Sequence, residues 1–214
     1  MSMPPPRTPQ SRSRAIGRVA GQGERSERER TGGFVLIAAM VILMWLVETI
    51  DIVAGDLDGA GIHPRDPEGL VGIAASPFLH SGFAHLIGNT IPFVVLGAAI
   101  AVGGLARTLA VVGIVAGVGG LGTWLTAPSN TIVIGASGLV FGFATYLVAR
   151  GAYSRTPWHI AGGLVVLVIY GSTLLTGLVP TPGVSWQGHL FGAIGGVVAA
   201  RVLHRARRPA AAPV

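Results

Sequence analysis

Four polar residues that lie within apolar stretches of this chain could together cleave an amide bond: Ser137, His189, His85 and Asn89. A serine hydroxyl is a poor nucleophile until a base takes its proton, and a neutral imidazole can take that proton and return it to a leaving amine. Histidine and asparagine side chains, together with a backbone N–H at a helix start, can stabilise an oxyanion. The residue types therefore indicate acyl-transfer chemistry.

Each of these residues also has an ordinary structural explanation. An intramembrane serine commonly bonds a backbone carbonyl, and His85 and Asn89, four residues apart on one helix face, could hydrogen-bond between helices. The presence of all four together favours a catalytic site over four separate packing roles, because polar side chains are costly in a bilayer. No Asp or Glu occurs in a predicted span after the first. The serine and histidine would therefore act as a dyad without the usual carboxylate.

The composition predicts a membrane protein. Of the 214 residues, 50% are hydrophobic and 11% are charged, which is too apolar for an ordinary soluble domain and too short for more than one membrane domain. The net charge is +6, but the arginines fall in tails and short loops, so they indicate topology rather than nucleic-acid binding. The absence of cysteine excludes disulfides and thiol chemistry.

Six predicted spans carry these residues, since a helix needs about 20 residues to cross a bilayer core of about 30 Å. Residues 1–32, rich in Pro, Arg, Ser and Glu, are predicted to be disordered. Glu48 and Asp51 lie in the last turns of the first span and are expected to reach the interface. A long polar loop, residues 54–76, follows. The predicted spans cover residues 33–53, 83–104, 108–125, 135–150, 158–178 and 185–203.

The arginines predict the orientation of these spans. With the N-terminus in the cytoplasm, 14 of the 15 arginines lie on the inner side and Arg65 alone lies outside, in agreement with the positive-inside rule. We therefore expect a multi-pass protein of the cell membrane with both termini cytoplasmic. Its parts would be an N-terminal tail of residues 1–32, a six-helix domain of residues 33–204 and a C-terminal tail of residues 205–214.

Helix geometry predicts that Ser137 and His189 lie at the same depth. Ser137 precedes Arg150 by 13 residues and His189 precedes Arg201 by 12 residues, on two helices that both run inward. At 1.5 Å per residue, both lie about 18 to 20 Å above these anchors, in the outer half of the bilayer. Close packing of the two helices is expected at small residues; these are Gly138 and Gly142 on one, and Gly188, Gly192 and Gly196 on the other.

The motifs resemble those of the rhomboid family of intramembrane serine proteases over about residues 34–204. They are, in the family's order, His85-Leu86-Ile87-Gly88-Asn89 (HxxxN), Gly135-Ala136-Ser137-Gly138 (GxSG), and His189 with Gly192 and Gly196 (HxxGxxxG). The resemblance implies an all-α polytopic protein, a six-transmembrane-helix rhomboid-like bundle. It also implies that Ser137 is the nucleophile, His189 the general base, and His85 and Asn89 the oxyanion donors.

The resemblance extends to two supporting residues and to the substrate. Phe141 stands where the family often has a Tyr stacked on the catalytic His, so the aromatic face is kept without its hydroxyl. His80 matches a further His that is common before HxxxN, and a structural or hydrating role is expected for it. The implied partners are the lipid bilayer and single-span membrane proteins, cut in or near the outer part of the bilayer. No cofactor is expected.

Two other classes of function stay open. A catalytically inactive rhomboid-like chaperone or adaptor would share the fold, although such proteins usually lack the Ser or the His of the dyad. A metal-dependent protein or transporter could use His80, His85 and His189. However, the chain has no HExxH motif, and His80 and His85 are five residues apart rather than the four that place two ligands on one helix face. We therefore expect no metal.

Overall fold

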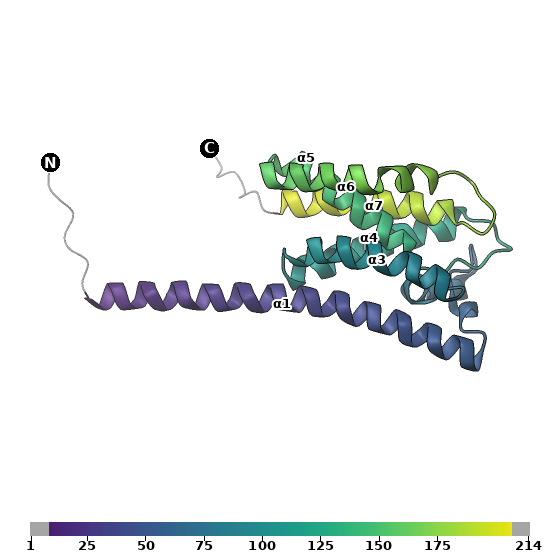
Figure 1. Ribbon diagram of the computed structural model, residues 1–214, viewed down its shortest axis with the longest axis horizontal. Coiled ribbons are helices and arrows are strands. Elements are labelled where there is room, and N and C mark those ends of the chain that lie inside the picture. Colours follow the sequence, from purple (N-terminus) through teal and green to yellow (C-terminus); the bar gives the residue numbers. More distant parts are fainter. Residues whose placement is uncertain (1–8, 207–214) are drawn as a thin grey trace.

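The computed structural model describes residues 9–206 of the chain, and their side chains from residue 22. The described part is helical, with three short 3-10 helices in the loop after the first helix (Figure 1). In chain order, the elements are α1 (Pro9–Ala54), η1 (Asp58–Ala60), η2 (Pro67–Leu70), α2 (Gly72–Ala75), η3 (Ser76–Phe78), α3 (Phe83–Ala101), α4 (Leu105–Thr126), α5 (Ser137–Ser154), α6 (Pro157–Thr176) and α7 (Trp186–Arg205).

The long helices lie where the hydrophobic segments predict them, and their ends have local causes. Gly82 and Gly104, with φ angles of 105° and 94°, turn the chain immediately before α3 and α4. Most residues avoid these angles, and glycine adopts them readily. Proline at the first position of α6 needs no hydrogen bond for its missing N–H. The predicted start of a helix near Phe83 is confirmed.

The prediction that residues 1–32 are disordered is wrong for residues 9–32. In the structure these residues continue the first apolar span toward the N-terminus as one helix, α1, which extends well beyond the other helices (Figure 1). After Pro9 the segment contains no proline, and Arg, Glu, Gln and Ala are good helix formers. Extending an existing helix also avoids the cost of a new nucleus. The predicted disorder of residues 1–8 falls outside the described residues.

Four helices in the described part of the chain are long and apolar enough to cross a membrane: residues 22–54 of α1, and α3, α4 and α6. The helices α5 and α7, which carry Ser137 and His189, are less apolar because they lie inside the bundle. They pack against each other, α5 also packs on α3, α4 and α6, and α7 packs on α4. A helix that contacts protein rather than lipid does not need an apolar surface on every side.

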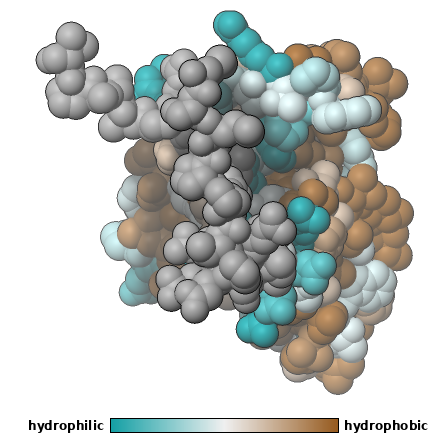
Figure 2. Space-filling model, turned by 90° about the vertical axis from the view of Figure 1, so that its left-hand side faces the viewer, coloured by the Kyte–Doolittle hydropathy of each residue, from teal (hydrophilic) through white to brown (hydrophobic). Residues whose placement is uncertain are grey.

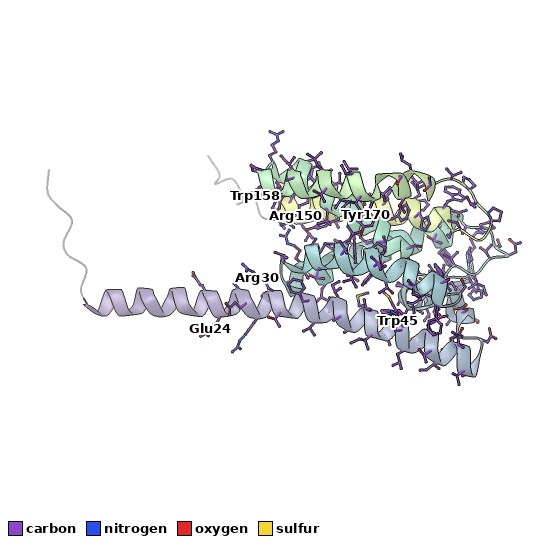
Figure 3. The ribbon with its side chains drawn as sticks, viewed as in Figure 1. Glu24, Arg30, Trp45, Arg150, Trp158 and Tyr170 are labelled. Carbon is purple, nitrogen blue, oxygen red and sulfur yellow. The ribbon has the colours of Figure 1, made fainter. Side chains whose placement is uncertain are left out.

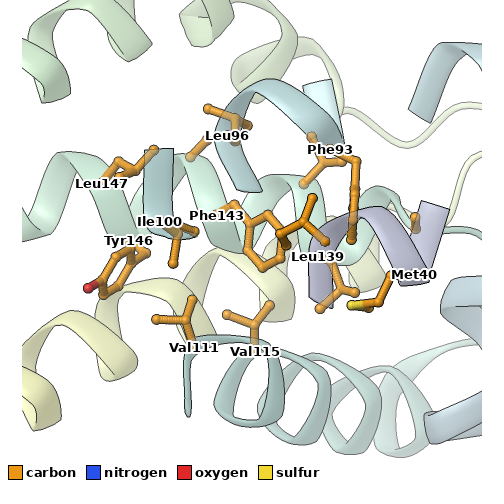
Figure 4. Packing of buried hydrophobic residues seen from close by; sticks show 14 of the residues in the cluster. Met40, Phe93, Leu96, Ile100, Val111, Val115, Leu139, Phe143, Tyr146 and Leu147 are labelled. Carbon is orange, nitrogen blue, oxygen red and sulfur yellow. The ribbon is translucent and has the colours of Figure 1, made fainter. Parts of the chain in front are cut away.

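The hydrophobic core lies between α1, α3, α4 and α5 (Figure 4). Phe93 of α3 and Phe143 of α5 are fully buried there, with ring centroids 5.3 Å apart. Val111 and Val115 of α4 close one side, and α1 contributes a buried stripe that includes Met40. This core fixes α5 relative to α3, and thereby Ser137 relative to His85.

Glu48 continues the buried stripe of α1, so the expectation that it reaches the interface is wrong. Its side chain is 1% exposed, and neither carboxylate oxygen has a hydrogen-bond partner among the described residues. The adjacent turn brings Trp45 against Phe83 at the start of α3, and the Trp45 indole N–H donates to the Thr90 hydroxyl. The last turns of α1 are therefore packed against α3.

The loop after α1 is fastened to the loop between α4 and α5. Ile62 and Val133 exchange two backbone hydrogen bonds of 2.9 and 3.0 Å. The guanidinium of Arg65 donates to the Leu125 carbonyl and to the Ser129 hydroxyl. These bonds join two long loops at the end of the bundle where α5 and α7 begin, so the loops form a fixed cap over that end.

Charged groups gather at the two ends of the bundle. Arg30 and Arg150 lie at the end from which α1 projects (Figure 3), and the acidic loop residues Asp56, Asp58 and Asp66 lie at the other end. Viewed from the α1 end, hydrophobic residues cover much of the sides of the bundle (Figure 2). Trp158, Val168 and Val53 are among the most exposed apolar side chains. A molecule with apolar sides and polar ends fits a bilayer.

Candidate active site

Glycines bring the backbones of α5 and α7 into direct contact, as the spacing predicts. A Cβ atom on Gly192 would overlap the carbonyl of Gly138 and lie 3.1 Å from its Cα, and one on Gly196 would overlap the carbonyl of Gly142. A Cβ on Gly138 would lie 3.3 Å from the carbonyl oxygen of Gly188. Any larger residue in this interface would separate the two helices, so the glycines set the distance between Ser137 and His189.

The hydroxyl of Ser137 lies 2.9 Å from Nε2 of His189. The other ring nitrogen, Nδ1, lies 2.7 Å from the carbonyl oxygen of Gly177, the residue that ends α6. A carbonyl only accepts, so Nδ1 carries the proton and the neutral ring has its lone pair on Nε2. The Ser137 hydroxyl therefore donates to Nε2, which is the arrangement that a general base requires.

The ring of Phe141 lies against the imidazole of His189. The two ring centroids are 4.1 Å apart and the planes differ by 5°, a stacked arrangement that fixes the tilt of the imidazole. The aromatic face that the resemblance implies at this position is therefore present. Phe141, His189 and Gly177 form one packed group, because a Cβ on Gly177 would overlap the Phe141 ring and lie 3.1 Å from Nδ1 of His189.

His85 approaches the Ser137 loop from the first turn of α3. Its Nδ1 lies 3.4 Å from the backbone N–H and 3.3 Å from the hydroxyl of Ser81. A backbone N–H can only donate, so Nδ1 accepts and the neutral ring carries its proton on Nε2. That edge of the ring faces Gly135, where a Cβ would lie 2.9 Å from Nε2. His85 therefore presents an N–H donor beside the serine loop.

Asn89 lies one turn further along α3 and is 6% exposed. One of its amide N–H groups donates to the backbone carbonyl of His85 at 3.0 Å. An asparagine amide has two N–H groups, so a second donor remains. Asn89, His85, Ser137 and His189 all line one cavity of about 610 Å³. The structure thus brings together the four residues that the motifs predict.

The backbone N–H of Ser137 follows two consecutive N–H groups, those of Gly135 and Ala136, that are already hydrogen-bonded. Val133 donates to Ile62, Gly135 donates to the Ser76 carbonyl at 2.8 Å, and Ala136 donates to the imidazole of His80. Gly135 adopts a φ of 109°, which aims the chain into α5. Ser137 is the first residue of α5, and among the described residues its N–H has no hydrogen-bond partner.

His80 does not line the cavity. It is completely buried behind the Ser137 loop, with its ring 5.1 Å from that of His85 in an edge-on arrangement. The described residues contain no group of three or more His, Cys, Asp or Glu side chains placed to hold a metal ion. The three histidines of the alternative metal hypothesis, His80, His85 and His189, are instead engaged with Ala136, Ser81 and Gly177.

Two contacts of this site have no signature in the sequence. The carbonyl of Gly177 and the backbone N–H of Ser81 orient the two histidines, and every residue except proline carries such backbone groups. Gly177 follows α6 and lies 12 residues before His189, so no spacing rule connects them. The sequence offers one indirect signal for the Gly177 contact. Because the spans after the first contain no carboxylate, Nδ1 of His189 has to find another hydrogen-bond acceptor.

Comparisons with known proteins identify a family. Residues 67–206 match the model of the Rhomboid domain. An uncharacterized protein of Mycobacterium tuberculosis, Rv1337, is 45% identical over 84% of this chain and 79% of its own length. An uncharacterized protein of Mycobacterium leprae, ML1171, is 43% identical over 82% of this chain and 73% of its own. A Bacillus subtilis protein named "Putative rhomboid protease YdcA" is 28% identical over 55% of this chain and 59% of its own.

Proposed function

The chain belongs to the rhomboid family, and on this premise we propose that it is a serine endopeptidase that cleaves single-span membrane proteins within or near the outer part of the bilayer. The observation that carries the proposal is the hydrogen bond of 2.9 Å between Ser137 and His189, with Nδ1 of His189 donating to Gly177. A serine used only for helix packing has no need of an imidazole held in this tautomer.

The reaction begins with transfer of the Ser137 proton to Nε2 of His189 as Oγ attacks the scissile carbonyl carbon. The carbonyl oxygen becomes an oxyanion, which accepts hydrogen bonds from the Ser137 N–H, from Nε2 of His85 and from the amide of Asn89. His189 then gives its proton to the departing amine, and the acyl group stays on Ser137. A water molecule, activated by the same imidazole, hydrolyses the acyl-enzyme and restores the serine.

The carbonyl of Gly177 takes part of the role of the absent carboxylate. It holds the imidazole in position and accepts from Nδ1, but it brings no negative charge to balance the imidazolium that forms. The stacked ring of Phe141 adds a weak attraction between its face and that cation. Ser137 and His189 therefore act as a dyad without a carboxylate, and the uncharged carbonyl of Gly177 orients the imidazole.

The substrate must expose a peptide bond at the cavity. In a membrane helix each carbonyl is already hydrogen-bonded, so the segment to be cut has to unwind before Ser137 can attack. Substrates with helix-weakening residues after the cleavage site satisfy this requirement. The cavity of about 610 Å³ has room for several residues of extended chain as well as water.

The proposal includes a topology of six spans, in which α5 and α7 also cross the bilayer. With both termini in the cytoplasm, the end that carries Arg30 and Arg150 in Figure 3 faces inward and the acidic loops face outward. This arrangement supports a cavity that opens toward the outside and receives water from there.

Labelling with a fluorophosphonate, which reacts with activated serines, tests the proposal. We expect one adduct per chain, mapped to Ser137 by mass spectrometry, no adduct in His189→Ala, and no effect of a chelator. A matched control is Ser172→Ala, a serine of α6 outside the cavity, which should be labelled like the wild type. Absence of an adduct at Ser137 in a folded, membrane-inserted protein would instead favour an inactive rhomboid-like adaptor.

A further inference from the structure

The segment from Ser76, the first residue of η3, to His80 is attached directly to the loop that presents Ser137. The carbonyl of Ser76 accepts the N–H of Gly135 at 2.8 Å, and Nε2 of His80 accepts the N–H of Ala136 at 3.4 Å. These two consecutive N–H groups immediately precede the nucleophile. The loop is thus held by one backbone group and by one side chain, and the side chain can be changed by mutation.

His80 makes this contact from a place that substrate cannot reach. Its side chain is fully buried and does not line the cavity. The contact with Ala136 requires a lone pair on Nε2, so the neutral ring carries its proton on Nδ1. Nδ1 is itself buried, and its proton is directed at the backbone of Phe78.

The anchored residue controls the direction of the Ser137 N–H. Ala136 lies between the peptide group that carries its own N–H and the peptide group that carries the N–H of Ser137. Fixing the first group limits rotation of the second, because only the two dihedral angles of Ala136 separate them. Gly135, on the other side, has a φ of 109° and offers little conformational restraint of its own. The contact with His80 therefore adds a restraint at Ala136, next to the conformationally permissive Gly135.

His80 also contacts the other half of the oxyanion site. Its ring meets that of His85 edge-on at 5.1 Å, and the next residue, Ser81, supplies the donors that fix the tautomer of His85. One short segment therefore reaches both the backbone donor of Ser137 and the side-chain donor of His85.

We propose that His80 is a positioning residue of the oxyanion site, which acts by accepting the N–H of Ala136 and so directs the N–H of Ser137 toward the cavity. This inference rests on the proposed function. It assigns His80 a role as hydrogen-bond acceptor rather than as acid, base or water ligand. It therefore predicts that a side chain with an acceptor at the same place can replace the imidazole.

Three variants distinguish the role of His80 as a hydrogen-bond acceptor from the role of its ring in packing. The Oε1 atom of His80→Gln lies near the place of Nε2 and can accept from Ala136, whereas the shorter side chain of His80→Asn places its oxygen near Nδ1. His80→Phe keeps the ring and removes the acceptor. Each variant is purified, its thermal unfolding is measured, and kcat and KM are determined with a single-span substrate. Hydrogen exchange of the Ala136 amide, followed by NMR on protein labelled with 15N-alanine, reports on the contact without requiring activity.

We expect His80→Phe and His80→Asn to lower kcat by about 10- to 100-fold, with little change in KM and with faster exchange at Ala136. His80→Gln should keep most of the wild-type kcat and the slow exchange. A folded His80→Phe protein with the kcat and the Ala136 exchange rate of the wild type would overturn the proposal. A His80→Gln protein with a kcat as low as that of His80→Phe would also overturn it.

Two further outcomes are also decisive. If His80→Phe does not fold, the comparison of His80→Gln with His80→Asn remains: a more active Gln variant supports the acceptor role, and equal activities overturn it. If the wild-type protein cleaves nothing, the proposed function fails, while the exchange series still decides whether His80 anchors Ala136.

Discussion

Nδ1 of His189, on α7, lies 2.7 Å from the carbonyl oxygen of Gly177, at the end of α6. The base is thus oriented by a helix other than the one that carries it. The same carbonyl belongs to a residue that packs against Phe141 of α5. Three helices therefore meet at one imidazole, and a shift of α6 at this end would change the protonation geometry of His189 directly.

Gly177→Ala should slow cleavage by about 10- to 100-fold, since small displacements of a catalytic group are costly. The new Cβ would overlap the Phe141 ring and lie 3.1 Å from Nδ1 of His189, while the φ of −69° suits alanine. The loss would therefore come from crowding of the imidazole and not from backbone strain. The matched control is Gly171→Ala, within α6, where a Cβ would meet nothing within 4 Å. Equal cleavage rates for the two variants would contradict the role assigned to this contact.

The cleavage rate should rise with pH through the range in which an imidazole loses its proton. His189 must be neutral at Nε2 to accept the Ser137 proton, so protonation of the ring at lower pH removes the base. The measurement is kcat/KM between pH 5 and 8, the interval in which histidine changes charge, with unfolding monitored at each pH. A rate that falls steadily across this interval in a stable protein would exclude a histidine base.

Gly192→Ala should destabilise the bundle by about 1 to 3 kcal/mol, the usual cost of adding a methyl group to a filled interface. The added Cβ would overlap the carbonyl of Gly138 on α5, so the two helices must separate. The measurement is thermal unfolding in detergent. Gly113→Ala is the control, because this glycine of α4 faces open space and alanine there should be neutral or slightly stabilising. A Gly192→Ala protein as stable as this control would show that the two helices are not held by close contact.

Ser137→Cys should react with a small, membrane-impermeant thiol reagent added from the outside. The chain has no cysteine of its own, so the introduced thiol is the only target. Leu167→Cys, at a side chain on α6 that is 45% exposed and would face lipid, should not react. The reaction at residue 137 can be slow, because an apolar environment raises the pKa of a thiol. Labelling of Ser137→Cys from the cytoplasmic side alone would overturn the proposed topology.

Much of this fold could be predicted from the sequence because a bilayer restricts which backbone structures can cross it. A segment such as residues 105–126 has to be a helix, since no other arrangement satisfies its backbone in lipid. The meeting of Ser137 with His189 could also be predicted, because Gly138, Gly142, Gly192 and Gly196 recur every fourth residue and mark the contact faces of α5 and α7.

The remainder depends on contacts that residue types do not encode. The helical state of residues 9–32 could not be distinguished from disorder, because the same polar, charged composition is compatible with both. The buried position of Glu48 was missed because a carboxylate in the last turns of a span ordinarily extends to the interface. The anchoring of Ala136 by His80 joins two loops 56 residues apart, and no local pattern records it.

The most direct test of the central claim is cleavage of a single-span membrane protein by the purified chain in liposomes, with the products mapped by mass spectrometry. The wild-type protein should cut within or near the outer part of the span, and Ser137→Ala and His189→Ala should each abolish the cut. The double variant should be no worse than either single one, because the two residues act as one unit. Cleavage at the same site by the Ser137→Ala protein would contradict the account.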